Sequence, residues 1–153
     1  MDLDKVLSIA VSGVRLEEGP RVRELIESCG LVVEDVSDQM LRDFLVARKG
    51  SEVIGVVGLE FCGPDALLRS LAVAEVRRGQ GVAKLLAASA EKYARARKAA
   101  TLYLLTNTAA RFFAGCGYER IDRGQAPEKI CATAEFSRIC PNSAVCMRKS
   151  LVG

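Results

Sequence analysis

Apolar positions along this chain follow two patterns, one with the period of a strand and one with the period of a helix. Apolar runs with strand character predict strands at residues 7–14, 44–48, 52–61, 66–73, 101–105, 118–122 and 144–151. Helical spacing and capping residues predict helices at residues 19–29, 36–41, 82–98 and 109–116. Hairpin-linked strands come first and strands then alternate with helices, so the order predicts a mixed α/β sheet covered by helices.

The clearest helix begins at Val82 and ends near Lys98. Its apolar face is predicted to hold Val82, Leu85, Leu86, Ser89, Tyr93 and Ala94. Its polar side carries Lys84, Glu91, Lys92 and Arg95, and Glu91 is spaced to pair with Arg95. Before the last strand, residues 124–142 form a proline-flanked insert with a helical centre and the character of a lid.

Length and composition are those of one globular domain. The chain has 153 residues, half of them apolar and 27% charged, so residues 1–153 are expected to fold as a single domain. No apolar run reaches the roughly 18–20 residues that span a bilayer, and the mixed, acidic start at residues 1–5 does not resemble a signal peptide. A cytoplasmic protein without a membrane partner is therefore expected. A net charge of +3 is too small to indicate nucleic acid as a partner.

Histidine is absent, and this restricts the chemistry more than any other feature of the composition. Ser-His-Asp and Cys-His nucleophiles and imidazole-based zinc sites are excluded, so a general base must be Asp, Glu, Tyr, Lys, Cys or water. The six cysteines, at 29, 62, 116, 131, 140 and 146, form no C-x-x-C pair, so we expect reduced thiols and no metal site. A soft-metal or metalloid contact among Cys131, Cys140 and Cys146 is left open.

A basic, glycine-rich turn, Arg78-Gly79-Gln80-Gly81, lies between a predicted strand and the clearest helix. Free N–H groups at a helix N-terminus attract anions, and glycine lets a phosphate approach the backbone. The turn is not a Walker A loop, and it departs from the dinucleotide fingerprint because Lys84 stands at the third glycine position. The alternative is a plain tight connection with solvated arginines.

The wider pattern resembles a known family. Leu71-Ala72-Val73 followed by Arg78-x-x-Gly81-x-Ala83 resembles the acetyl-CoA motif of the GNAT N-acetyltransferase superfamily. The segments 104–107, 110–113 and 115–118 resemble the second half of that signature, in the same order and spacing. The resemblance covers most of the chain. It implies the GNAT fold, a mixed central β-sheet with a splayed strand pair, flanked by helices, with acetyl-CoA as co-substrate.

The resemblance also implies where the coenzyme binds. The pantetheine arm would lie between the strand of Leu71, Ala72 and Val73 and the strand of residues 102–106, bonded to backbone groups near Leu71 and Val73. Asn107 matches a position whose side chain often touches the coenzyme. The pyrophosphate would lie on the backbone amides of Arg78, Gly79, Gln80, Gly81, Val82 and Ala83.

Two finer resemblances concern the acceptor. Residues 58–60 with 66–73, and a C-terminal block within residues 126–144, are similar to GNAT enzymes encoded in arsenic-resistance operons. Residues 105–109 with Phe112 are similar to the catalytic domain of N-acetylglutamate synthase. Both imply a small amino-acid-like amine, either an amino acid or an amino-acid-analogue toxin, as acceptor.

Glu60 is the predicted general base, because it lies late in its strand, beside the strand that would hold the coenzyme. Asp65 and Glu75 are weaker candidates. Many family members carry tyrosine where this chain has Phe113, which cannot protonate the departing thiolate, while Phe112 is predicted to lie in the core. The thiolate then leaves unaided or through water, or a hydroxyl such as Thr106 or Ser70 assists.

An amino-acid acceptor needs a counter-charge for its carboxylate, and a guanidinium is the best match. Arg69 and Ser70 adjoin the predicted acetyl site, and Arg69 should share a sheet face with Leu71 because strand side chains alternate. Arg138 and Ser143 come from the variable insert and its end. The alternative for Arg69 is a pair with a surface carboxylate.

The sequence therefore predicts an acetyl-CoA-dependent N-acetyltransferase that transfers the acetyl group directly to a small amine. Three alternatives stay open at this point: a protein N-acetyltransferase, a non-catalytic acyl-CoA-binding regulator, and a thiol-based metalloid-binding protein suggested by the six cysteines. Whether the protein forms a homodimer is also left open.

Overall fold

Seven strands form one sheet in the part of the chain that the computed structural model describes, residues 8–139 and 143–152. The strands are β1 (Ile9–Gly13), β2 (Phe44–Lys49), β3 (Glu52–Cys62), β4 (Asp65–Val73), β5 (Thr101–Thr106), β6 (Glu119–Ile121) and β7 (Val145–Ser150). Their order in the sheet is β1-β2-β3-β4-β5-β7-β6. β4 and β5 run parallel, whereas β1–β2, β2–β3, β5–β7 and β6–β7 are antiparallel pairs. The predicted mixed α/β sheet is thus confirmed.

The helices connect these strands at the predicted places with one exception. They are α2 (Gly19–Ser28), α3 (Val82–Ala96), α4 (Ala110–Gly115) and α5 (Glu128–Cys131), with the 3₁₀ turns η1 (Leu16–Glu18), η2 (Met40–Asp43), η3 (Glu75–Arg77) and η4 (Arg123–Gln125) and the π-helix η5 (Glu135–Ile139). The helix predicted at 36–41 is wrong, because the chain turns there and forms only the 3₁₀ turn η2. Ser37 still caps this turn, its Oγ accepting from the Met40 N–H at 3.1 Å. So short a segment does not sustain an α-helix by itself.

The described chain divides into two compact units. The first unit holds the residues up to Gly58 together with Ser70–Ala90, and the second holds Leu59–Arg69 together with Glu91–Gly153.

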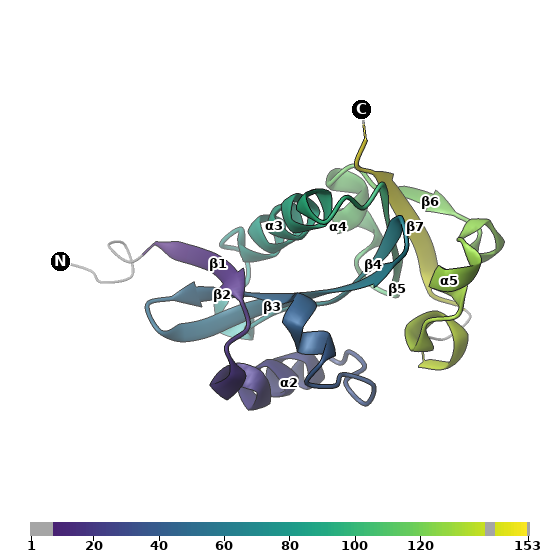
Figure 1. Cartoon of the computed structure of the whole chain (residues 1–153). Helices are drawn as coiled ribbons and strands as arrows, with labels where there is room; N and C mark the ends of the chain where they lie inside the picture. Colours follow the sequence, from purple (N-terminus) through teal and green to yellow (C-terminus); the bar gives the residue numbers. More distant parts are fainter. Residues whose placement is uncertain (1–7, 140–142, 153) are drawn as a thin grey trace. The chain divides into compact units, whose positions relative to one another are not determined.

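In the first unit, helices cover both faces of the sheet (Figure 1). Residues Val22, Leu25 and Ile26 of α2 are buried in one cluster with Phe44, Val46 and Val56 of the strands. On the other face Gly55 admits α3, because a Cβ at Gly55 would lie 2.8 Å from Leu86 and 3.1 Å from Val82. The predicted apolar faces of both helices are therefore the ones that pack on the strands.

Two positions of α3 differ from the prediction. Leu85 is 39% exposed, because Val82 and Leu86 are the residues that face Gly55 and Leu85 is turned away from them. Glu91 is buried, and the Lys149 Nζ donates to it at 2.8 Å and also to the Cys116 carbonyl at 2.7 Å. The predicted pair of Glu91 with Arg95 exists only as a looser contact at 3.9 Å.

In the second unit, the insert at 124–142 contributes to the core. Its Ala126, Ile130 and Phe136 are buried in one cluster with Leu67, Tyr103 and Cys146 of the strands. Figure 1 shows α5 beside β7, which is consistent with this packing. Apolar side chains therefore anchor the described part of the insert to the strands of the second unit.

One buried ion pair predicts a stability effect. In the first unit the Arg48 guanidinium donates to both Glu18 carboxylate oxygens, at 2.7 and 2.5 Å, and to the Gly13 carbonyl at 2.8 Å. Hydrogen bonds from Arg48 hold the pKa of Glu18 below its ordinary value. We expect Glu18→Gln to lower the free energy of unfolding by about 3–5 kcal/mol at neutral pH, because it leaves a buried guanidinium without its counter-charge.

Urea denaturation of Glu18→Gln against Glu24→Gln measures this effect. Glu24 forms an exposed pair with Arg21, so its variant should change the free energy of unfolding by at most about 1 kcal/mol. The folded pKa of Glu18 is lowered, so its contribution is present above the unfolded pKa and is lost as the pH falls through the folded pKa. A Glu18→Gln effect that is small at pH 7, or that grows in acid, would contradict the assignment.

Candidate functional site

The glycine-rich turn before α3 has a backbone shape that favours glycine. Gly79 and Gly81 have φ angles of +79° and +81°, which glycine adopts without strain. A Cβ built on either glycine meets no other atom within 4 Å, so the turn is open on that side. Residues 78–81 are exposed, whereas Val82 is buried and Ala83 half-buried.

This turn leads directly into α3. The first N–H groups of any α-helix have no hydrogen-bond acceptor within the helix. The helix begins with the Leu85 N–H donating to the Gly81 carbonyl at 3.1 Å. Backbone donors, an open glycine turn and the positive end of a 15-residue helix therefore converge on one exposed place. A coenzyme pyrophosphate fits this arrangement of residues.

The end of β4 presents backbone groups on its edge away from β3. The Ala74 N–H donates to the Ile54 carbonyl of β3 at 2.9 Å. Since neighbouring residues of a strand direct their backbone groups to opposite edges, those of Val73 and Leu71 face the other edge. The Val73 carbonyl accepts from Arg78 Nε at 3.4 Å, so the Arg78 side chain folds back onto the strand end.

Ser70 interrupts the regular alternation of β4. It has a φ of +58° and is buried, an unusual backbone state for a residue with a side chain. Residues on its two sides therefore do not follow the strict period of two. The regular alternation from which Arg69 is predicted to share a face with Leu71 is thus interrupted between them, and the shared face stays a prediction.

Arg69 lies between two carboxylates of the second unit. Its Nη1 donates to Glu60 Oε2 at 3.1 Å, and its Nε lies 3.9 Å from Glu135 Oε1. The Arg69 side chain has no exposed surface, Glu135 exposes 10% of its side chain and Glu60 exposes 23%. Two sequence-predicted site residues, Glu60 and Arg69, are thus in direct contact, and Glu60 is the member of this cluster that reaches solvent most.

The other predicted acids lie elsewhere. Asp65 begins β4, at the end opposite to Leu71 and Val73, and its register partner is Thr101 at the start of β5. Burial raises the pKa of Asp65. Glu75 is exposed on η3 of the first unit.

At the end of β5 the chain enters α4 through a capped turn. Thr106 Oγ1 accepts from the Ala109 N–H at 2.9 Å, and Asn107 next to it is exposed. Phe113 is 4% exposed and packs edge-on against Phe112 and Tyr118, whereas Phe112 is only half-buried. The prediction that Phe112 is the core residue is therefore wrong. Phe113 is the residue that meets the ring of Tyr118, and it therefore occupies the core.

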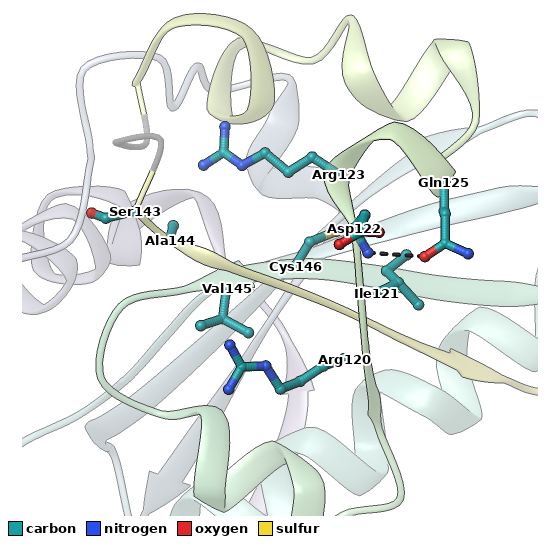
Figure 2. A pocket seen from close by; sticks show the side chains of 9 residues that line it. All are labelled: Arg120, Ile121, Asp122, Arg123, Gln125, Ser143, Ala144, Val145 and Cys146. Carbon is teal, nitrogen blue, oxygen red and sulfur yellow. Dashed lines mark hydrogen bonds between the residues drawn. The ribbon is translucent and has the colours of Figure 1, made fainter.

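A pocket of about 420 Å³ opens in the second unit (Figure 2). Residues 120–123 and 143–146 line it together with Gln125, whose Oε1 accepts from the Asp122 N–H at 2.9 Å. Ser143 is exposed on its wall. Cys146 also lines it, and burial raises the pKa of this thiol to about 11, so it is uncharged at neutral pH. Arg138 lies in η5, but its side chain falls outside the described part of the chain.

The predicted residues thus fall into three groups. Leu71, Ala72, Val73 and residues 78–83 belong to the first unit, as does Ser70, whereas Glu60, Arg69 and Asn107 belong to the second. Ser143 lines the pocket of Figure 2. Sequence reasoning missed Glu135 and the pocket residues Arg120 and Arg123. The signal for Glu135 was a lone carboxylate between Ala134 and Phe136 in a mostly apolar turn.

Two further findings concern residues 8–139 and 143–152. In these ranges no group of three Cys, Asp or Glu side chains is arranged to hold a metal ion. No helix there is long and apolar enough to cross a membrane.

Comparison with known proteins gives two sequence matches. Residues 41–120 match the acetyltransferase (GNAT) domain family. An uncharacterised N-acetyltransferase, CT2212 of Chlorobaculum tepidum, is 31% identical over 121 residues, which cover 78% of this chain and 75% of that protein.

Two solved structures share the fold. N-acetylglutamate synthase of Neisseria gonorrhoeae, complexed with coenzyme A and N-acetyl-glutamate, has a TM-score of 0.83 at 16% identity. The match covers 95% of this chain but only 36% of the synthase, so this chain spans about a third of that protein. Rv2747 of Mycobacterium tuberculosis, in complex with CoA and NLQ, has a TM-score of 0.81 at 20% identity and matches over 94% of this chain and 99% of its own.

Proposed function

Because this chain belongs to the GNAT acetyltransferase family and is an acetyl-CoA-dependent N-acetyltransferase, we propose that its acceptor is a small amino-acid-like amine. The observation that carries the proposal is the contact between Glu60 and Arg69 at 3.1 Å. A zwitterionic amino acid carries the complementary pair of charges, an ammonium for Glu60 and a carboxylate for Arg69. Because the Arg69 side chain has no exposed surface, the proposal requires that Arg69 become accessible when the acceptor binds. The name of one structural relative, N-acetylglutamate synthase, agrees with an amino-acid acceptor.

Acetyl-CoA, the co-substrate, supplies an activated acetyl thioester. We place its pyrophosphate on the backbone amides of residues 78–83, which the positive φ angles of Gly79 and Gly81 support. The backbone of Leu71, Ala72 and Val73 would hold the pantetheine arm and polarise the thioester carbonyl, with Asn107 as a further contact. The backbone groups of Leu71 and Val73 face the edge of β4 away from β3, which supports this part of the proposal.

In this mechanism Glu60 removes a proton from the acceptor ammonium, directly or through water, and the free amine attacks the acetyl carbonyl. Its partial exposure, 23% of the side chain, supports access by the acceptor. Phe113 has no proton to donate and is buried against Tyr118. The departing thiolate therefore leaves unprotonated or takes a proton from water or from the hydroxyl of Ser70 or Thr106.

Arg69 is the proposed carboxylate partner, with Ser70 beside it. Ser143 would contact the rest of the acceptor from the pocket wall, and Arg138 would do so from the insert. In its most specific form, the proposal is that the natural acceptor is an amino-acid-analogue toxin. It rests on the sequence resemblance alone, and part of that resemblance, residues 140–142, lies outside the described residues.

Arg69→Lys is expected to raise the KM for the acceptor by about ten- to a hundred-fold and to leave the KM for acetyl-CoA unchanged. A single ammonium cannot replace the planar fork of a guanidinium, and a hydrogen bond to a charged partner contributes roughly 1.5–3 kcal/mol. Steady-state kinetics with each substrate varied in turn measures both constants. If both KM values rise together, Arg69 supports the fold or the coenzyme site instead.

A thiol-release assay across a panel of acceptors tests the proposed function. The panel contains L-amino acids, their phosphinic and arsinic analogues, simple amines without a carboxylate, and peptides with free N-termini or lysines. We expect turnover with one or more of the amino acids or their analogues. Turnover restricted to peptides would indicate a protein N-acetyltransferase. Turnover restricted to simple amines would show that the enzyme does not recognise a carboxylate on its acceptor.

A further inference from the structure

We propose that Glu135, supplied by the insert between β6 and β7, is a positioning residue that holds Arg69 and through it fixes the carboxylate of Glu60. The inference rests on the proposed function, in which Glu60 is the base. Neither the binding of the coenzyme nor the transfer of the acetyl group to the acceptor requires Glu135 directly.

The geometry gives Arg69 two anchors on different nitrogens. Nη1 meets Glu60 at 3.1 Å, and Nε faces Glu135 at 3.9 Å, a distance of ion pairing without a hydrogen bond. A guanidinium is planar and rigid, so carboxylates at two of its nitrogens define the orientation of its plane more closely than one carboxylate does. Glu135 therefore restricts how Arg69 presents Nη1 to Glu60.

The charges divide the roles of the two acids. A guanidinium with no exposed surface requires a compensating carboxylate, because an uncompensated buried charge is strongly unfavourable. Glu135, with 10% of its side chain exposed, is the deeper of the two acids, and Glu60, with 23%, is the more accessible. If Glu135 compensates Arg69, Glu60 does not have to serve as its sole counter-ion and can exchange protons with an acceptor.

The backbone that carries Glu135 is well anchored. Next to it, Phe136 is buried in the apolar cluster of the second unit. Thr133 braces the start of η5, since its Oγ1 donates to the Ile130 carbonyl at 2.7 Å and its carbonyl accepts from the Ser137 N–H at 2.9 Å. A π-helix is a rare element that is often found at functional sites. Glu135 thus projects from a fixed segment, as a positioning residue must.

The test compares Glu135→Gln with Glu128→Gln, a matched change at an exposed glutamate of the same insert. We expect Glu135→Gln to lower kcat by about ten- to a hundred-fold, the scale of a misplaced catalytic group, with the KM for acetyl-CoA unchanged. Glu128→Gln should leave both constants as they are. Glu135→Asp retains the negative charge if the neutral variant fails to fold, and its shorter side chain should produce a smaller loss of kcat.

A double-mutant cycle with Glu60→Gln separates positioning from general stability. If Glu135 acts through Glu60, adding Glu135→Gln to Glu60→Gln causes no further loss of kcat. Additive losses, or wild-type kcat in Glu135→Gln, would overturn the inference while the role of Glu60 stands. Near-normal kcat in Glu60→Gln would overturn the proposed base itself, and a severe loss in Glu135→Gln alone would then make Glu135 the base.

Discussion

Glu60→Gln is expected to lower kcat by about 10²–10⁴-fold, the usual effect of losing a general base. The amide keeps the shape of the side chain but cannot accept the proton of the acceptor ammonium. Without the base, the reaction depends on the small fraction of acceptor amine that is already unprotonated in solution. The rate of the variant should therefore continue to rise with pH, whereas the wild-type rate levels off. Steady-state kinetics from about pH 6 to pH 10 measures both properties.

Glu52→Gln is the matched control on the same strand. Glu52 lies at the exposed start of β3, where it pairs with Arg77 at 3.0 Å, and its variant should keep the wild-type kcat and pH profile. Suppose instead that Glu60→Gln also retains full kcat and an unchanged profile. Then no side chain acts as base at this position, and the enzyme binds only the free amine.

Gly81→Glu is expected to abolish the binding of acetyl-CoA. A glutamate at a φ of +81° strains the turn, and its carboxylate would meet the negative charge of the pyrophosphate at the start of α3. The variant should still fold, because a Cβ at this position meets no atom within 4 Å. Calorimetric titration with acetyl-CoA measures the affinity, and circular dichroism checks the fold.

Gly50→Glu is a control with comparable strain and the same added charge. Gly50 has a φ of +63° in the exposed turn between β2 and β3, so this variant should bind acetyl-CoA with wild-type affinity. An unchanged affinity for acetyl-CoA in folded Gly81→Glu would show that the coenzyme does not bind at this turn. Equal loss of affinity in both variants would assign the effect to backbone strain.

The sequence predicted the features that depend on local chemistry. The turn at residues 78–81 could be predicted from Gly79 and Gly81, because glycine adopts the positive φ angles of such a turn without strain. The face of α2 was predicted because Val22, Leu25 and Ile26 recur with the helical period, and they are the residues buried there. In both cases, the residues that decide the structure lie within a few positions of one another.

Features that depend on distant partners were missed. Glu91 was predicted on a polar face, but Lys149, 58 residues further on, supplies the counter-charge that lets it be buried. The break in alternation at Ser70 has no local signal, because serine is not a residue that favours a positive φ. The contact of Arg69 with Glu135 was not predicted either, because the two residues lie far apart in the sequence. Arg69 and Glu60 were each predicted as site residues, but not as partners.

The most direct test of the account compares kcat/KM for an amino-acid acceptor with that for its α-carboxamide, which keeps the amine but lacks the carboxylate. We predict a value about ten- to a hundred-fold lower for the carboxamide, the cost of losing a charged hydrogen-bond partner for Arg69. The same comparison in Arg69→Lys should show a much smaller ratio. Equal values of kcat/KM for the acid and the carboxamide in the wild-type enzyme would contradict recognition of an amino-acid-like acceptor.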